Sequence, residues 1–182
     1  MNYLSIEKAS LTNGKGVRVV LWVSGCSIHC RGCHNPESWD YNSGKIFDTQ
    51  SEQELFDALS KPYIQGVTLS GGHPLEDANL EDVFSLVCEI RNRFPQKDIW
   101  LYTGLELNYK DFIYNPNMAE KNDSEYNSNL RAGIICQCDV VVDGAYIESQ
   151  RDTTLPFRGS ENQRLIDVNE TLKSKHIIHY HP

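Results

Sequence analysis

Three cysteines lie close together in the segment GCSIHCRGCHN, residues 25–35. Cys26, Cys30 and Cys33 are spaced so that one short loop can present all three thiols to a single centre. Cysteine thiolates hold iron–sulfur clusters, and a [4Fe–4S] cube normally takes four of them. A loop that supplies three therefore predicts a cluster with one iron left open for a substrate or cofactor.

A structural zinc site of the Cys3His type is the alternative, with His29 or His34 as its fourth ligand. Zinc usually takes its ligands from two separated pairs, whereas these cysteines share one tight loop. The remaining cysteines are expected to pack in the fold. Cys88 lies on the apolar side of an expected helix, and Cys136 and Cys138 point to one face at the start of an expected strand.

The elements that must position this loop are expected from runs of apolar and β-branched residues. Buried strands are predicted over residues 18–24, 66–70, 98–103 and 138–143. Helices are predicted over 51–60, where Ser51 and Glu54 have capping-box spacing, and over 79–94, where apolar residues repeat at helical spacing. Alternating strands and helices predict an α/β fold with a mostly parallel sheet and crossover helices.

The cysteine-bearing loop 24–36 leaves the carboxyl end of the first expected strand, the edge at which parallel α/β folds place ligands. The polar segment 114–130 is expected to be a surface loop with room for a short helix. Residues 153–164 are expected to be irregular, and 175–182 to form a last short strand. We expect a single domain over residues 1–182.

The composition limits the classes of function. The chain has 182 residues, of which 40% are hydrophobic, enough for a core without disulfides. A net charge of -8 argues against a general nucleic-acid binder. No apolar run approaches the roughly 18 residues of a membrane span, and the first residues do not resemble a signal peptide. We therefore expect a cytoplasmic protein with reduced thiols and neither membrane nor nucleic-acid partners.

The chain resembles the radical S-adenosylmethionine (SAM) enzymes, which carry three cysteines spaced CxxxCxxC after the first strand. LTNGKGVRVVLWVSGC (11–26) resembles the Asn-Gly-x-Gly-x-Arg segment of glycyl-radical activating enzymes, and LSGGHPL (69–75) matches their Gly-Gly-x-Pro segment. KDIWLYTG, DVVVDGAY and FRGSENQR (97–104, 139–146 and 157–164) are similar to activating proteins of anaerobic ribonucleoside-triphosphate reductase. These segments occur in the family's order from about residue 1 to 165.

This resemblance implies a trimmed, partial (βα) barrel of radical SAM type. It implies that Cys26, Cys30 and Cys33 ligate a [4Fe–4S] cluster, and that the amino and carboxylate groups of SAM take the open iron. The residues implied to border SAM are Gly32, Cys33, His34, Gly71, Gly72, His73 and Pro74. The two glycines after residue 70 would let the backbone approach the methionine moiety.

The implied reaction is radical formation on a partner protein. The reduced cluster passes one electron to the sulfonium, giving methionine and a 5′-deoxyadenosyl radical that abstracts hydrogen from a glycine of the reductase large subunit. The cofactors supply the chemistry, and no further catalytic residue is expected. The implied electron donor is flavodoxin or a similar low-potential carrier.

Two positions depart from the family pattern. His73 stands where relatives often have an acidic residue that would orient the substrate amine. Gly32 stands where many radical SAM enzymes place an aromatic residue against adenine, as in the reductase-activating branch. His34 is a candidate flat partner for adenine, and a role in stabilising the loop is the alternative.

Further candidate residues lie in the last third of the chain. The candidate partner contacts are Arg158, Asn162, Gln163 and Arg164, with hydrogen bonding inside the fold as the alternative. Asp143 ends a strand at the ligand edge and also suits a turn. His176, His179 and His181 are expected to lie in a solvated tail.

Two other functions compete with the activating enzyme. One is a small radical SAM enzyme that acts on a small molecule, such as a deazaguanine precursor. The other is a non-catalytic module that holds an iron–sulfur cluster or zinc. An electron carrier would normally have its cube fully ligated, so a missing fourth cysteine disfavours it.

Overall fold

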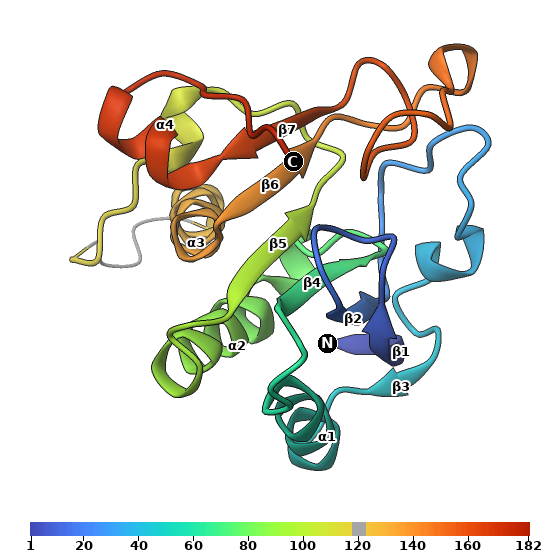
Figure 1. Ribbon diagram of the computed structural model, residues 1–182, viewed down its shortest axis with the longest axis vertical. Helices are drawn as coiled ribbons and strands as arrows, with labels where there is room; N and C mark the ends of the chain where they lie inside the picture. Colours follow the sequence, from blue (N-terminus) through green and yellow to red (C-terminus); the bar gives the residue numbers. More distant parts are fainter. Residues whose placement is uncertain (118–122) are drawn as a thin grey trace.

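The computed structural model describes residues 1–117 and 123–182, and those residues form a seven-stranded sheet with strand order β3-β1-β2-β4-β5-β6-β7 (Figure 1). The strands are β1 (Asn2–Ser10), β2 (Arg18–Val23), β3 (Lys45–Ile46), β4 (Gly66–Gly71), β5 (Asp98–Tyr102), β6 (Val140–Asp143) and β7 (Arg164–Asp167). The central strands β2, β4, β5 and β6 are parallel. The outer strands β1, β3 and β7 pair antiparallel, and the sheet is open.

The four strands expected from the sequence are confirmed, and they are the four parallel ones. The strand at 18–24 is not the first, however, because β1 precedes it and pairs with it antiparallel. β1 lies near the sheet edge, where most of its side chains stay at least partly exposed. A strand of that kind has no continuous apolar run, so the hydrophobic pattern did not reveal it.

Helices α1 (Thr49–Leu59), α2 (Leu80–Arg93) and α3 (Asp123–Gln137) cover one face of the sheet (Figure 1). The expected helices at 51–60 and 79–94 are confirmed. The expected capping box is wrong, because Ser51 lies inside the first turn of α1. The cap is Asp48, whose carboxylate accepts hydrogen bonds from the backbone nitrogen and hydroxyl of Ser51, at 2.9 and 3.0 Å.

Helix α3 corrects two expectations. Residues 123–130 begin a helix of 15 residues, longer than the short helix for which the expected surface loop left room, and residues 118–122 of that segment lie outside the described residues. Cys136 belongs to the helix and not to a strand, since β6 begins at Val140. The first two turns of the helix are mostly polar and give no apolar pattern in the sequence, and its buried residues begin only at Leu130.

The last part of the chain also differs from expectation. Residues 153–163 are irregular as predicted, but β7 and helix α4 (Val168–Ser174) follow them. Asp167 caps α4 by accepting a hydrogen bond from the Glu170 nitrogen at 2.9 Å. The expected strand over 175–182 is reduced to one isolated bridge between His179 and Ile166.

Two apolar layers enclose the sheet. The larger lies between the sheet and the helices and takes side chains such as Ile99, Leu101 and Val141. The smaller lies on the opposite face, where Trp100 packs with Val140, Val142 and Leu165 beside the partly buried Tyr102, Phe157 and Tyr180. This alternation along β5 and β6 gives each strand two buried faces, as expected for central parallel strands.

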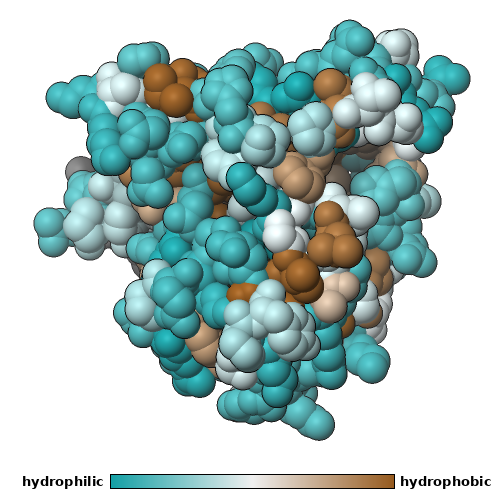
Figure 2. Space-filling model, viewed as in Figure 1, coloured by the Kyte–Doolittle hydropathy of each residue, from teal (hydrophilic) through white to brown (hydrophobic). Residues whose placement is uncertain are grey.

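The surface in the view of Figure 2 is mostly hydrophilic, with apolar residues in small separate patches. No helix in the described ranges is both long enough and apolar enough to cross a bilayer.

The strand order and the parallel pairing of the four central strands confirm the α/β class and the mostly parallel sheet. The loops after β2, β4, β5 and β6 all emerge at one edge of the sheet, and that edge holds the candidate site.

Candidate functional site

A cavity lies at the carboxyl ends of the parallel strands. The loop after β2, residues 24–36 and called here the cysteine loop, contributes Cys26, Cys30 and Cys33 to its wall. Gly71, Gly72 and His73 from the end of β4 form the neighbouring part of the wall. The segments after β5 and β6 complete it. The fold thus brings together three cysteines and the glycine pair that are about 40 residues apart in the sequence.

Backbone hydrogen bonds fix the start of the cysteine loop. The nitrogen of Gly25 donates to the Ser38 carbonyl at 2.8 Å, and that of Cys26 donates to the Trp39 carbonyl at 3.2 Å. The ring of His29 stacks on Trp39 with 4.6 Å between centroids. This stacking holds His29 against the short helix that follows the cysteine loop, Pro36–Trp39.

The thiols lie near one another without converging on a point. Burial raises the pKa of the Cys30 thiol, and the neighbouring Cys26 and Cys33 add to that rise, while a hydrogen bond from the Tyr146 backbone opposes it. Among the described residues, no three His, Cys, Asp or Glu side chains converge closely enough to hold one metal ion. Three thiols on one cavity wall are the ligand type that iron–sulfur clusters use.

A backbone donor points at one of the thiol sulfurs. The Asn35 nitrogen donates to the Cys33 sulfur at 3.4 Å. Hydrogen bonds to cysteine sulfurs tune the reduction potential of iron–sulfur clusters. The loop therefore provides three thiols together with a donor of the kind that such a cluster uses.

The glycines of the site are required by the protein's own backbone. A Cβ on Gly72 would lie 2.6 Å from the Gly25 carbonyl oxygen, and Gly71 has a φ of 106°. The end of β4 therefore packs directly against the cysteine loop, and the His73 nitrogen donates to that same Gly25 oxygen at 2.8 Å. Gly32 has a φ of 75°, which favours glycine over the aromatic residue of other radical SAM enzymes.

His73 is buried in the cavity wall with a polar partner on each ring nitrogen. Its Nε2 lies 2.8 Å from the Thr103 hydroxyl, and its Nδ1 lies 3.4 Å from the Glu76 carboxylate. Burial lowers the pKa of His73, so the imidazole is neutral at pH 7. Sequence reasoning missed Thr103 and Glu76, and Glu76 stands only three residues after His73 as an ordinary polar residue.

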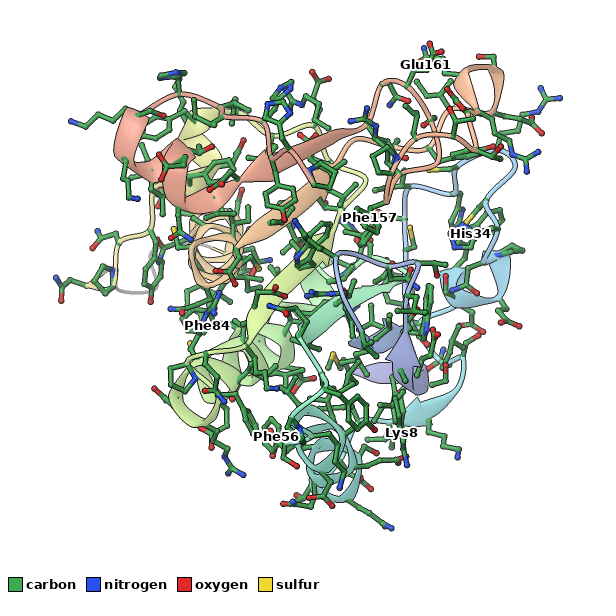
Figure 3. The ribbon with its side chains drawn as sticks, in the orientation of Figure 1. Lys8, His34, Phe56, Phe84, Phe157 and Glu161 are labelled. Carbon is green, nitrogen blue, oxygen red and sulfur yellow. The ribbon has the colours of Figure 1, made fainter. Side chains whose placement is uncertain are left out.

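His34 lies where the cavity meets a neighbouring groove. Its ring is edge-on to Trp22, with 6.4 Å between centroids. The groove runs between residues 11–13 and residues 153–159, and it includes Phe157 and Arg158. Figure 3 shows the labelled His34 and Phe157 on facing loops at this edge of the molecule.

The residues predicted to contact a partner divide into two groups. Asn162 donates to the Ala145 carbonyl at 2.8 Å, Gln163 donates to the Gly144 carbonyl at 3.0 Å, and Arg164 pairs with Asp143. These three side chains tie the segment before β7 to the end of β6, and Gln163 also lines the cavity. Arg158 instead borders the groove.

The other cysteines do not line the cavity in the part of the chain that the structure describes. Cys88 is half-buried on α2, where a core position was expected. Cys136 donates to the Phe112 carbonyl at 3.2 Å, and the buried Cys138 donates to the Ile134 carbonyl at 3.3 Å. The geometry thus leaves three cysteines at the cavity and no fourth.

Comparison with known proteins agrees with this geometry. A family model described as a 4Fe-4S single cluster domain matches residues 12–166. The anaerobic ribonucleoside-triphosphate reductase-activating protein of Enterobacteria phage T4 is 40% identical over 165 residues, which cover 91% of this chain and 93% of that protein. The chain belongs to this family of activating proteins.

Bacterial members of the activating-protein family are similar along the same length. The protein of the same description from Haemophilus influenzae is 38% identical over 165 residues, covering 90% of this chain and 96% of its own. That from Escherichia coli K12 is 36% identical with the same coverage. The resemblance inferred from the motifs is therefore confirmed, and the matching family model supports a [4Fe–4S] cluster in this chain.

Proposed function

We propose that this protein activates an anaerobic ribonucleoside-triphosphate reductase by generating a glycyl radical on its large subunit with a [4Fe–4S] cluster and SAM. The observation that carries the proposal is the set of three cysteines on one cavity wall, next to the Gly-Gly-His-Pro segment at the end of β4. The names of the relatives supply the target protein. The proposed location is the cytoplasm, and the proposed electron donor is flavodoxin or a similar carrier.

In this proposal Cys26, Cys30 and Cys33 ligate three irons, and the fourth iron binds SAM. When bound, the cluster and SAM together supply an electron transfer and the radical that removes a hydrogen atom from glycine. Gly32, His34, Gly71, Gly72, His73 and Pro74 border the SAM molecule. The barrel type is part of the same proposal, with residues 1–182 as one trimmed radical SAM domain around the open sheet.

The chain's own residues prepare and shield this site. The packing of Gly72 against Gly25 fixes the distance between the cysteine loop and the end of β4. The backbone nitrogen of Asn35 stabilises thiolate charge on Cys33. The neutral, buried His73 closes the wall without placing a cation beside a positively charged sulfonium.

The groove beside His34 is the proposed path for the glycine-bearing segment of the reductase. It is continuous with the cavity through His34 and Tyr102, which line both. Leu11 is exposed at its rim, and Arg158 lines its other side. Asn162, Gln163 and Arg164 contribute by holding the loop that carries Arg158, since their side chains are engaged inside the fold.

The test is a glycine-centred radical signal. Oxygen-free, reconstituted protein is mixed with SAM, a reductant and the large subunit of an anaerobic reductase, and the doublet is followed by electron paramagnetic resonance (EPR). We expect the doublet with wild-type protein and its loss in Cys30→Ala. A reductase subunit with its radical glycine replaced by alanine is the control. Reductive SAM cleavage without any doublet would point to a small-molecule substrate and refute the proposed target.

A further inference from the structure

A carboxylate outside the Gly-Gly-His-Pro segment holds the cysteine loop. Glu76 accepts a hydrogen bond from the Ser27 backbone nitrogen at 2.9 Å and another from its hydroxyl at 3.0 Å. Ser27 directly follows Cys26, so this contact fixes the backbone between Cys26 and Cys30. The Glu76 side chain is only 14% exposed, which strengthens charge-assisted hydrogen bonds.

Two further side chains fix the position of that carboxylate. Glu76 lies 3.4 Å from Nδ1 of His73, and Nε2 of His73 lies 2.8 Å from the Thr103 hydroxyl. The Thr103 hydroxyl accepts a hydrogen bond from the Leu105 nitrogen at 3.2 Å. The Glu76 carboxylate can only accept, so its contact with the neutral imidazole places the ring proton on Nδ1 and leaves Nε2 to accept from the Thr103 hydroxyl.

The resulting chain of contacts joins three loops that surround the cavity. It begins on the cysteine loop at Ser27, passes through Glu76 and His73 after β4, and ends at Thr103 after β5. Burial acts to raise the pKa of Glu76, but the donors on Ser27 and the nearby His73 hold it below its usual range. Glu76 is therefore an anion at neutral pH and a strong acceptor for Ser27.

We propose that Glu76 is a positioning residue that holds the cysteine loop in its cluster-binding shape, and that His73 orients it. The inference rests on the proposed function only in that the loop ligates the cluster. The carboxylate that acts on the loop therefore lies three residues after His73, outside the Gly-Gly-His-Pro segment. The required feature is an acceptor oxygen at the reach of a glutamate side chain.

Three variants separate reach from charge. Glu76→Gln keeps an oxygen for the Ser27 nitrogen and an amide that can donate to its hydroxyl. Glu76→Asp keeps the charge but is one methylene too short, and Glu76→Ala removes both. Glu81→Gln, exposed in the first turn of α2, is the matched control.

The readouts are iron per protein after anaerobic reconstitution, the rate of iron loss to a chelator, and the EPR spectrum of the reduced cluster. We expect roughly tenfold faster iron loss and an altered spectrum in Glu76→Asp and Glu76→Ala. Glu76→Gln and the Glu81→Gln control should resemble wild type. Thermal unfolding of the apo forms shows whether each variant is folded. If Glu76→Ala does not fold, the comparison of Glu76→Asp with Glu76→Gln tests the proposal.

Equal cluster retention in Glu76→Asp and wild type would overturn the positioning role. Loss in Glu76→Gln as severe as in Glu76→Asp would also overturn it, because a position-specific acceptor predicts rescue. Wild-type protein that binds no cluster at all would instead refute the proposed function. The two failures are therefore distinguishable.

Discussion

Two guanidinium nitrogens of Arg164 donate hydrogen bonds to the carboxylate of Asp143, with 3.0 Å between Nε and Oδ1. Asp143 is fully buried at the end of β6 and also accepts a hydrogen bond from the Leu107 nitrogen at 2.8 Å. Arg164 begins β7 and donates to the Leu107 carbonyl at 2.7 Å. The pair therefore closes the edge of the sheet beside the cavity, which is a structural task for a residue that the sequence presented as a partner contact.

Replacing Arg164 with alanine should destabilise the apo protein by roughly 2–3 kcal/mol, because the buried Asp143 carboxylate loses its countercharge. The measurement is urea unfolding followed by circular dichroism. Arg164 is partly exposed, so water can reach the carboxylate's edge and the loss stays at the low end of values for buried pairs.

The control is Lys173→Ala, which removes a solvent-exposed pair with Glu170 and should leave the midpoint unchanged within error. If Arg164→Ala unfolds at the wild-type midpoint and yet fails to activate the reductase, the residue contacts the partner and the structural assignment is wrong.

The sequence revealed the parallel strands because β2, β4, β5 and β6 are buried on both faces and so consist of apolar residues. It did not reveal β1 or α3, whose stability comes from neighbours in the fold. β1 is held by pairing with β2, and α3 packs against α2 with only its second half apolar. The pattern of residues within one segment does not show which other segments that segment will contact.

Protonation of His73 should make stability depend on pH. Burial lowers the pKa of His73 in the folded state, whereas the pKa of a histidine in the unfolded chain is about 6.5. Below that pH the unfolded chain binds more protons, so stability falls as pH decreases, with a slope of at most about 1.4 kcal/mol per pH unit for one group. The dependence fades about one pH unit above 6.5, where the histidine is neutral in both states.

His73→Gln should remove this slope from the apo protein. The free energy of unfolding is measured between pH 7.5 and pH 5 for both forms, and the difference between the two curves isolates the histidine from Glu76, Asp77 and Arg131 around it. A difference curve that is flat across the whole range would show that His73 titrates normally in the folded protein.

Gly72→Ala should destabilise the protein by about 3 kcal/mol and lower its iron content. The new methyl would lie 2.6 Å from the Gly25 oxygen and 2.9 Å from the Ser38 oxygen, both of which are backbone atoms that can move only with the cysteine loop. Urea unfolding of the apo form and iron analysis after reconstitution give the two results.

Gly104→Ala is the matched control on the same cavity. There the nearest atom is Cδ1 of Ile28 at 2.4 Å, the end of a side chain that can rotate away. We expect a cost below about 1 kcal/mol and normal iron content. Equal losses in both variants would indicate that the cavity tolerates no added volume, and not that β4 and the cysteine loop are specifically packed.

The part of the candidate site that one sequence motif forms could be predicted, whereas the contacts between residues far apart in the sequence could not. Cys26, Cys30 and Cys33 share one segment, so their spacing is visible in the sequence. The contact between Ser27 and Glu76 spans 49 residues, and that between His73 and Thr103 spans 30. Both depend on the parallel register of β2, β4 and β5, which no local pattern specifies.

Cysteine alkylation should separate the site thiols from the structural ones. In the native apo protein, Cys138 should be protected, because it is buried and burial raises its pKa strongly, so it has little thiolate at pH 8. The half-buried Cys30, Cys33 and Cys88 should react measurably. Peptide mass spectrometry after a timed pulse of iodoacetamide gives the rate at each position.

Anaerobic reconstitution with iron and sulfide should then protect Cys30 and Cys33 together, remove any residual reactivity of the buried Cys26, and leave the rate at Cys88 unchanged. Cys88 is the internal control, because it lies on α2 away from the cavity and its reactivity reports only its own helix. Each thiolate bound to iron is unavailable to the reagent, so protection counts ligands without relying on activity. Protection that extends to Cys88 or Cys136 would show a fourth cysteine on the cluster, and an open iron for SAM would then be excluded.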